Sequence, residues 1–179
     1  MNKTVAAAAV AGMMAGGGAQ AAGPEDTLLM ELRTGTVTIE MRPDLAPNHV
    51  ARIKELTRQG FYDGLKFHRV IEGFMAQTGD PRGDGTGGSG QNIDAEFSSA
   101  PFNRGTVGMA RSQNPNSGDS QFYIMFDRSP HLDNQYTVWG QVTEGMEHVD
   151  RIKMGISAMN GVVQDPDTII SMKVKADVK

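Results

Sequence analysis

Residues 67–88 read FHRVIEGFMAQTGDPRGDGTGG, and this stretch decides the fold. Its first half contains two strand-like pieces that meet near Glu72-Gly73, which predicts two short strands joined by a turn. Its second half opens a glycine-rich loop that runs from Gly79 to Gly90. The first question is whether this loop binds a phosphate group or only turns the chain.

Within the loop, residues 85–90 read GTGGSG and fit the pattern G-x-G-x-x-G, which can hold the pyrophosphate of a dinucleotide. Such a loop joins a buried parallel strand to a helix, because the helix N-terminus binds the phosphates. Here the preceding residues, GDPRGD, form a turn, and the following residues, QNIDAEF, have no helical periodicity. The context therefore indicates a surface loop in which glycines permit tight turns.

Two further patterns are weak evidence for a serine nucleophile and for a metal site. Gly118-Asp119-Ser120 resembles a fragment around a serine-protease nucleophile, but Gln-Phe follows it and no His/Asp pair is arranged with it. The histidines show no metal-binding spacing, and we interpret them as helix-surface, strand or loop residues; they are His49, His68, His131 and His148. We therefore expect neither a metal nor a cofactor.

The flanking sequence predicts many short strands. Residues 27–42 alternate between apolar and polar side chains and are broken at Thr34-Gly35, which predicts a β-hairpin. Strand parity in residues 67–71 places Phe67, Arg69 and Ile71 on one face, and His68 and Val70 on the other. Further strands are predicted in residues 105–111, 120–126, 136–142 and 167–178, the last with the apolar members Ile169, Met172, Val174 and Val178.

Two helices are predicted beside these strands. Asp44 to Pro47 opens the first, which ends at Gly60. Its apolar side carries Val50, Ile53, Leu56 and Ala51. Residues 145–153 form the second, a short helix. Many short strands with two helices predict an antiparallel barrel or sandwich with helical caps.

Composition supports one globular domain. The chain has 179 residues, of which 39% are hydrophobic and 21% charged, enough for a real core. The formal net charge is −4 and no basic stripe is present, so we expect no nucleic-acid partner. The chain has no cysteine, which excludes disulfides and thiolate catalysis.

The N-terminus predicts secretion. Lys3 precedes an apolar stretch from Val5 to Ala15, and Ala19-Gln20-Ala21 forms an A-x-A cleavage site. We therefore divide the chain into a signal peptide, residues 1–21, and a domain, residues 22–179, and expect a periplasmic protein. The apolar stretch is too short to span a bilayer. The alternatives are a disordered Ala/Gly tail and a cytoplasmic location.

Several segments in the same order resemble the cyclophilin family of peptidyl-prolyl cis–trans isomerases, bacterial branch. They are FHRVIEGFMAQTGDPRGDGTGG, GMAR, SQFYI, GFYDGLKFHRV and LDNQYTVWGQV. The resemblance runs from about Leu28 to Val178. It implies a mainly β fold, a closed eight-stranded antiparallel barrel capped by two α-helices, with a peptide groove on the outer face of the barrel.

The resemblance also implies the site residues. Arg69 matches the catalytic arginine. Gln77 would bind substrate backbone and help orient Arg69, and His68 would line or support the groove. The remaining matches hold substrate: Phe74, Met75, Tyr123 and Leu132 around the proline ring, Ala110 and Arg111 at the residue before proline, and Gln121, His131 and Tyr136 elsewhere in the groove.

Three of these residues depart from eukaryotic members of the family. His131 lies where many of them have a Trp that contacts cyclosporin, Tyr136 where they have a His, and Arg111 where they have an Asn. The departures fit a bacterial member and predict weak inhibition by cyclosporin.

The expected chemistry needs no nucleophile. Rotation about an X-Pro bond is slow because it breaks amide resonance, at a barrier of about 18–20 kcal/mol. At the twisted state the nitrogen regains its lone pair, so a fixed donor beside it lowers the barrier. We therefore expect a monomeric isomerase whose partners are proline-containing polypeptides. The alternatives are a module that holds X-Pro segments without catalysis, and a nucleotide- or metal-dependent enzyme.

Overall fold

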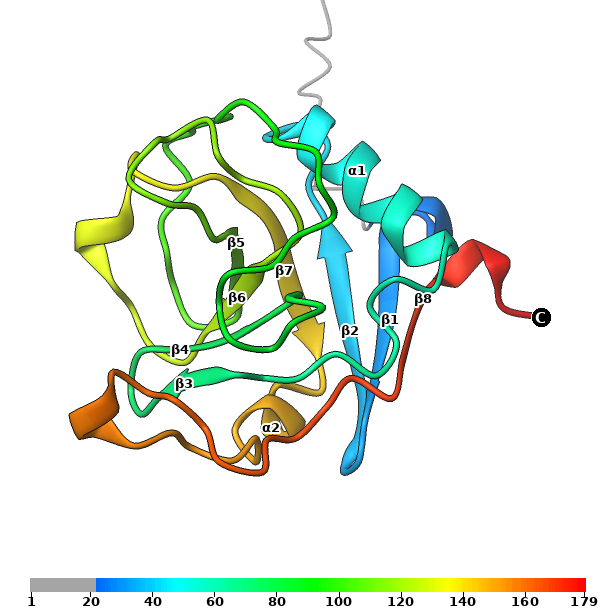
Figure 1. Ribbon diagram of the computed structural model, residues 1–179. Coiled ribbons are helices and arrows are strands. Elements are labelled where there is room, and N and C mark those ends of the chain that lie inside the picture. The colour runs from blue at the N-terminus through cyan, green and yellow to red at the C-terminus, as the bar shows by residue number, and fades with distance from the viewer. Residues whose placement is uncertain (1–21) are drawn as a thin grey trace, which may run out of the picture.

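Eight antiparallel strands form one curled sheet in the computed structural model, which describes residues 22–179 (Figure 1). The signal peptide expected in residues 1–21 lies outside the described residues. The order across the sheet is β3-β4-β6-β5-β7-β2-β1-β8. The strands are β1 (Thr27–Leu32), β2 (Gly35–Met41), β3 (Arg69–Ile71), β4 (Met75–Thr78), β5 (Thr106–Met109), β6 (Phe122–Met125), β7 (Val138–Glu144) and β8 (Ser171–Val174).

The predicted hairpin is confirmed. β1 and β2 pair from Thr27 opposite Glu40 to Leu32 opposite Gly35. Their inward side chains are buried because alternate residues of a strand point to the same face. The strands predicted in residues 105–111, 120–126 and 136–142 correspond to β5, β6 and β7.

The sheet is a half-barrel rather than the closed barrel that we expected. The edge strands β3 and β8 do not pair with each other. The chain ahead of β3 meets the chain ahead of β8 only through a bridge between Lys66 and Thr168 and nearby backbone bonds. The outer edge of β3 is instead occupied, because Val70 N donates to Gly161 O and Gly155 N donates to Val70 O.

Strand alternation divides the buried residues into two clusters. In β6, Phe122 and Ile124 point into the main core, whereas Tyr123 and Met125 point outward into a second apolar cluster. The parity predicted for residues 67–71 is wrong at its start, because Phe67 lies in the main core beside Val70. β3 begins only at Arg69, so the chain before it does not follow the strand period.

Helix α1 (Pro47–Arg58) packs against β8, and the shorter α2 (Met146–Val149) packs against β2. Figure 1 shows them at opposite ends of the molecule. Val50, Ile53 and Leu56 are buried as predicted. Ala51 is exposed, and α2 occupies only part of the predicted span.

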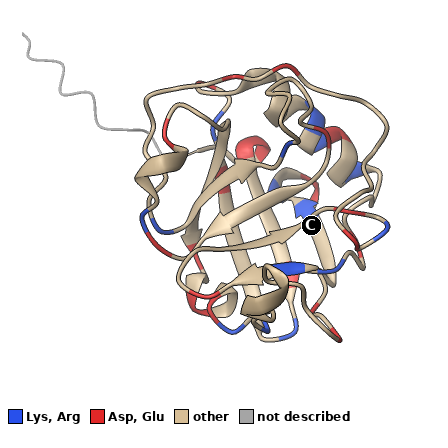
Figure 2. Ribbon diagram, turned by 60° about the vertical axis from the view of Figure 1, so that its left-hand side comes forward, with Lys and Arg blue, Asp and Glu red and all other residues tan. Residues whose placement is uncertain are grey.

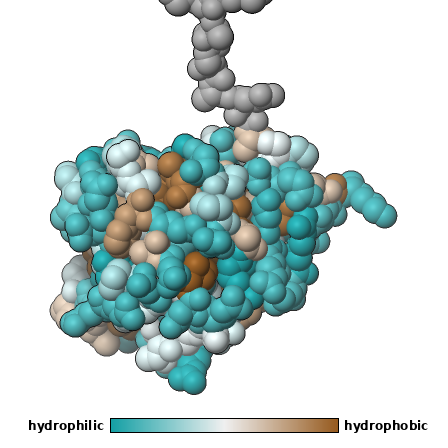
Figure 3. Space-filling model, turned by 90° about the horizontal axis from the view of Figure 1, so that it is seen from above, coloured by the Kyte–Doolittle hydropathy of each residue, from teal (hydrophilic) through white to brown (hydrophobic). Residues whose placement is uncertain are grey.

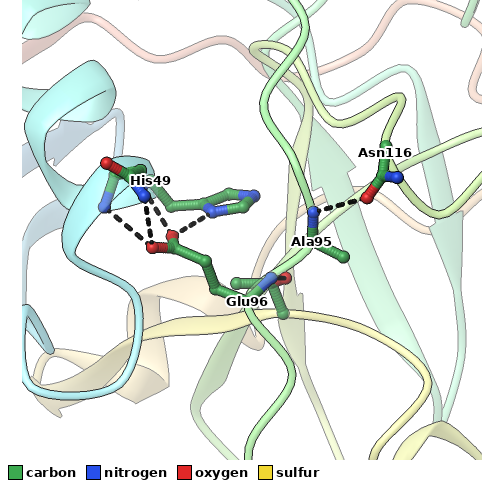
Figure 4. A network of polar contacts seen from close by, with 6 residues as sticks. His49, Ala95, Glu96 and Asn116 are labelled. Carbon is green, nitrogen blue, oxygen red and sulfur yellow. Dashed lines mark hydrogen bonds and ion pairs between the residues drawn. The ribbon is translucent and has the colours of Figure 1, made fainter.

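Glu96 caps α1 from a distant loop (Figure 4). The residue at the N-cap position is Ala46, whose side chain cannot accept a hydrogen bond. Glu96 Oε1 accepts from Asn48 N at 3.0 Å, and Glu96 Oε2 accepts from His49 N at 2.9 Å. His49 Nδ1 lies 2.6 Å from Glu96 Oε2. The side chain of His49 is only 1% exposed. Its interpretation as a helix-surface residue is therefore wrong.

The C-terminal end departs from the sequence prediction. β8 ends at Val174, and a 3₁₀ turn over Lys175–Asp177 follows it. Ile169, Met172 and Val174 are buried, but Val178 is exposed.

The surface carries mixed charge and separate apolar patches. Acidic and basic residues are interspersed in the view of Figure 2, and Figure 3 shows small apolar patches among hydrophilic residues.

Several exposed apolar side chains come from one loop, residues 154–162: Met154, Ile156, Met159 and Val162. No helix in residues 22–179 has the length and apolarity needed to cross a bilayer.

Candidate active site

A groove of about 890 Å³ lies over the outer face of the sheet, beside the second apolar cluster. Its walls come from segments far apart in the sequence, which the curled sheet brings together. All but one of the site residues expected from the sequence line it: His68, Arg69, Phe74, Met75, Gln77, Ala110, Arg111, Tyr123, His131, Leu132 and Tyr136. The exception, Gln121, lines an adjoining hollow that shares Gln77, Gly85, Ala110 and Arg111 with the groove.

One wall of the groove is a chain of hydrogen bonds. Arg69 Nη1 donates to Gln77 Oε1 at 3.1 Å, and Gln77 Nε2 donates to Gln121 Oε1 at 3.0 Å. Gln121 Nε2 donates in turn to the carbonyls of Gly85 and Gly87, at 3.1 and 2.8 Å. The register places Arg69 opposite Gln77 and Gln77 opposite Tyr123, so neighbouring strands set these spacings. The glycine carbonyls orient both amides, and thereby the acceptor that faces Arg69.

Arg69 keeps its positive charge uncompensated. Its other hydrogen bonds go to Asn160, from Nε to the backbone oxygen and from Nη2 to Oδ1, both at 3.1 Å. Within residues 22–179 no carboxylate lies at ion-pair distance from it, whereas Arg42, Arg104 and Arg128 each pair with an aspartate. Burial lowers the pKa of the Arg69 guanidinium, which nevertheless stays protonated at neutral pH.

The apolar part of the groove is a cup beside Arg69. Met75 and Leu132 are buried, and Phe74 packs against the same cluster. The ring of His131 lies 5.7 Å from that of Phe74 at an angle of 36°. Tyr123 is 5% exposed, and its hydroxyl has no hydrogen-bond partner among the described residues. Burial raises the pKa of this phenol, which is therefore neutral.

Arg111 and Tyr136 brace the far side of the cup. The Arg111 guanidinium lies over the Tyr136 ring, with Cζ 4.3 Å from the ring centroid. Arg111 Nη2 donates to Gln135 O at 2.6 Å, which ties the loop before β7 to the loop after β5. The Tyr136 ring meets that of Tyr123 edge-on, with centroids 6.0 Å apart. Ala110 lies beside them and adds little bulk.

The glycine loop flanks the groove and is organised by a carboxylate. Asp80 is buried and accepts hydrogen bonds from the backbone N–H groups of Arg82, Asp84 and Gly85. Burial acts to raise the pKa of Asp80, but these bonds together hold it below its usual range. His68 lies next to this loop, and burial lowers the pKa of its imidazole. No helix follows the loop in residues 91–129.

Sequence reasoning missed the wall formed by residues 159–163. Asn160, Met159 and Val162 line the groove, and Asn160 contacts Arg69 directly. Asn160-Gly161 is a typical turn dipeptide, so a turn could have been predicted there. Its place beside Arg69 depends on pairing between the loop and β3, 91 residues away in the chain.

This arrangement can bind an apolar ring next to a fixed, charged donor. It contains no side chain placed as an activated nucleophile with a neighbouring base. In residues 22–179 no group of three or more His, Cys, Asp or Glu side chains could hold a metal ion.

Comparisons with known proteins identify relatives of this chain. The sequence model described as "Cyclophilin type peptidyl-prolyl cis-trans isomerase/CLD" matches residues 27–174. A Brucella suis protein named "Probable peptidyl-prolyl cis-trans isomerase" is 57% identical over 173 residues, covering 90% of this chain and 88% of its own. A Synechococcus elongatus peptidyl-prolyl cis-trans isomerase is 42% identical, covering 83% of this chain and 96% of its own.

Solved structures show the same fold. The cyclophilin AquaCyp293 from Hirschia baltica superposes with a TM-score of 0.80 at 29% identity, covering 89% of this chain and 77% of its own. A Cryptosporidium parvum cyclophilin, solved in the presence of the dipeptide Ala-Pro, superposes with a TM-score of 0.75 at 27% identity, covering 83% of this chain and 98% of its own. The chain belongs to the cyclophilin family of peptidyl-prolyl cis–trans isomerases.

Proposed function

We propose that this isomerase acts on X-Pro bonds in unfolded or flexible protein segments, and that Arg69 is its catalytic residue. The proline ring enters the cup formed by Phe74, Met75, Tyr123 and Leu132. The prolyl nitrogen then lies beside the Arg69 guanidinium, which donates a hydrogen bond to the lone pair that appears as the bond twists. No covalent bond forms or breaks.

The other groove residues hold the substrate backbone. Gln77 offers its amide group on one side of the cup, and Gln121 offers its own in the adjoining hollow. Ala110 and Arg111 offer backbone and side-chain contacts to the residue before proline. His131, Tyr136 and His68 complete the walls. The cup is apolar where the ring enters and polar where the peptide backbone passes, which suits a proline-containing chain.

One observation carries this assignment: Arg69 borders the apolar cup, and its hydrogen bonds reach only neutral oxygens. An arginine in a surface ion pair would have its charge compensated by a carboxylate. Here the full charge remains available to a substrate, in a partly buried site where electrostatic interactions are strong.

The test is cis-to-trans conversion of an X-Pro peptide by residues 22–179 and by Arg69→Ala. We expect kcat/KM to fall about 100-fold in the variant, the usual effect of removing one preorganised donor. The control is Arg33→Ala, an exposed arginine paired with Asp167, which we expect to keep full activity.

Each other outcome has a definite meaning. If the Arg69→Ala variant keeps its activity, Arg69 is not the catalytic residue. Peptide binding without acceleration by either protein would make the chain a binding module on an isomerase scaffold. A thermal shift on adding nucleotide or metal would favour a nucleotide- or metal-dependent enzyme.

We further propose a periplasmic monomer that assists folding. The N-terminal pattern with its Ala19-Gln20-Ala21 cleavage site supports the periplasmic location. Uncatalysed prolyl isomerisation takes tens to hundreds of seconds, slow enough to limit the folding of secreted chains.

A further inference from the structure

The loop that carries Asn160 is clamped to the edge of β3. Asn160 follows the 3₁₀ turn Ser157–Met159 and has a left-handed backbone, with φ 54° and ψ 38°. Its neighbour Gly161 accepts a hydrogen bond from Val70 N at 2.8 Å, and Val163 N donates to His68 O at 3.1 Å. Before Asn160, Gly155 N donates to Val70 O at 2.9 Å. Bonds on both sides therefore fix Asn160 relative to the strand that holds Arg69.

Asn160 occupies one whole edge of the Arg69 guanidinium. Its backbone oxygen accepts from Nε and its Oδ1 accepts from Nη2, both at 3.1 Å. Gln77 Oε1 takes a third N–H, on Nη1. A guanidinium has five N–H donors in a rigid fork, so two remain for a substrate, one on each terminal nitrogen.

A free arginine side chain explores many rotamers, and a donor that must first be ordered stabilises a transition state less. Two oxygens from one rigid residue restrict rotation of the fork more than a single amide does. The left-handed backbone of Asn160 makes this possible, because it presents the carbonyl and the side chain to the same arginine.

We propose that Asn160 is a positioning residue of the isomerase reaction, which holds the Arg69 fork so that its free N–H groups face the groove. The inference rests on the proposed catalytic role of Arg69. The alternative is that Asn160 serves the turn alone, because asparagine tolerates a left-handed backbone better than most residues.

Asn160→Gly separates these possibilities. Glycine keeps the left-handed backbone and the carbonyl but removes Oδ1. The matched control is Asn134→Gly, at another asparagine with positive φ (58°), which lies outside the lining of the groove. We expect kcat to fall about tenfold in Asn160→Gly with KM little changed, since a small misplacement of a catalytic group slows the reaction strongly. The control should keep both values.

Two further measurements show whether the effect passes through Arg69. The ¹⁵N order parameter of the Arg69 Nε–H group should fall in Asn160→Gly and not in Asn134→Gly. In the Arg69→Ala background, adding Asn160→Gly should lower kcat no further. The thermal unfolding midpoint of each variant checks that the fold is intact.

The outcomes distinguish this inference from the proposed function. An unchanged kcat in Asn160→Gly, or an equal loss in the Arg69→Ala background, would overturn the positioning role while Arg69 could still be catalytic. If Arg69→Ala itself keeps full activity, the proposed function fails first. A loss of kcat with an unchanged Arg69 order parameter would also contradict the inference.

Discussion

The ring of Tyr123 fills the space that a side chain on Gly108 would need. A Cβ atom added to Gly108 would lie 2.6 Å from Tyr123 Cζ and 2.7 Å from Tyr123 Oη. It would also meet Phe102 Cε1 at 2.7 Å. The two residues face each other across paired strands, so the missing side chain on β5 makes room for the tyrosine of β6.

Gly108→Ala should therefore push Tyr123 into the cup. We expect kcat/KM to fall at least several-fold and the free energy of unfolding to drop by about 1–3 kcal/mol, as is usual for overpacking. Peptide isomerisation and urea unfolding measure the two effects. Adding Tyr123→Phe removes the Oη contact and should restore part of both values. An alanine variant with unchanged activity would show that the ring can move without disturbing the cup.

The hydrogen bonds that link Arg69 to Gln77 and Gln121 lead to a second prediction. Gln121→Met keeps the side-chain volume but removes the acceptor for Gln77 and the donor to Gly85 and Gly87. A neutral hydrogen bond contributes roughly 0.5–1.5 kcal/mol, so we expect kcat/KM to fall about three- to tenfold. The exposed Gln59→Met is the control and should match the unaltered chain. Equal activity of the two variants would show that Gln77 stays oriented without Gln121.

The capping contact between Glu96 and His49 makes stability depend on pH. Burial lowers the pKa of His49 below its usual value. As the pH falls below about 6.5, His49 is therefore protonated in the unfolded chain before it is protonated in the folded chain, and the folded state loses stability. Burial acts to raise the pKa of Glu96, but hydrogen bonds from Asn48 and His49 bring it below its usual value. Its contribution is thus present above about pH 4.3 and is lost at lower pH. Both groups therefore lower the free energy of unfolding as the pH falls.

Urea unfolding between pH 7 and pH 3 tests this. The free energy of unfolding should fall from about pH 6.5 downward, in two stages. Glu96→Gln should lower stability at pH 7 by about 1–2 kcal/mol, as for the loss of a helix cap, and should flatten the second stage. Glu147→Gln, an exposed carboxylate on α2, is the matched control. Constant stability across this pH range would contradict the assignment.

His131 predicts weak inhibition by cyclosporin. It is exposed at the rim of the cup and contacts Phe74. The family resemblance implies that many eukaryotic members have a tryptophan at this place. We expect inhibition only at micromolar concentrations, and tighter inhibition of His131→Trp, which restores a larger apolar surface. Inhibition of the unaltered chain at nanomolar concentrations would refute the prediction.

N-terminal sequencing tests the predicted signal peptide. Protein secreted through the inner membrane should begin at Ala22, after the Ala19-Gln20-Ala21 site. An intact Met1 on the mature protein would favour a cytoplasmic location.

Local patterns in the sequence predicted much of the fold. The alternation in residues 27–42 and the apolar spacing of Val50, Ile53 and Leu56 correspond to the observed hairpin and helix α1. Such signals are readable because the periods of strands and helices place apolar residues on one face. The family resemblance identified the residues that line the groove, which no periodicity could have done.

Predictions failed where a distant segment replaced a local partner. Phe67 does not point to the face predicted from strand parity, because β3 starts two residues later, beside the loop that holds Gly161. The barrel is not closed for the same reason, since this loop occupies the edge of β3 that β8 would need.

The sequence alone therefore determined the short-range elements, because these depend on residue type and local period. Its resemblance to the family indicated Arg69 and the residues of the cup. The tertiary structure decided which oxygens hold Arg69 and what caps α1. Asn160 and Glu96 lie 91 and 47 residues from the groups they contact. Contacts over such distances depend on how the whole sheet curls, and no local pattern encodes them.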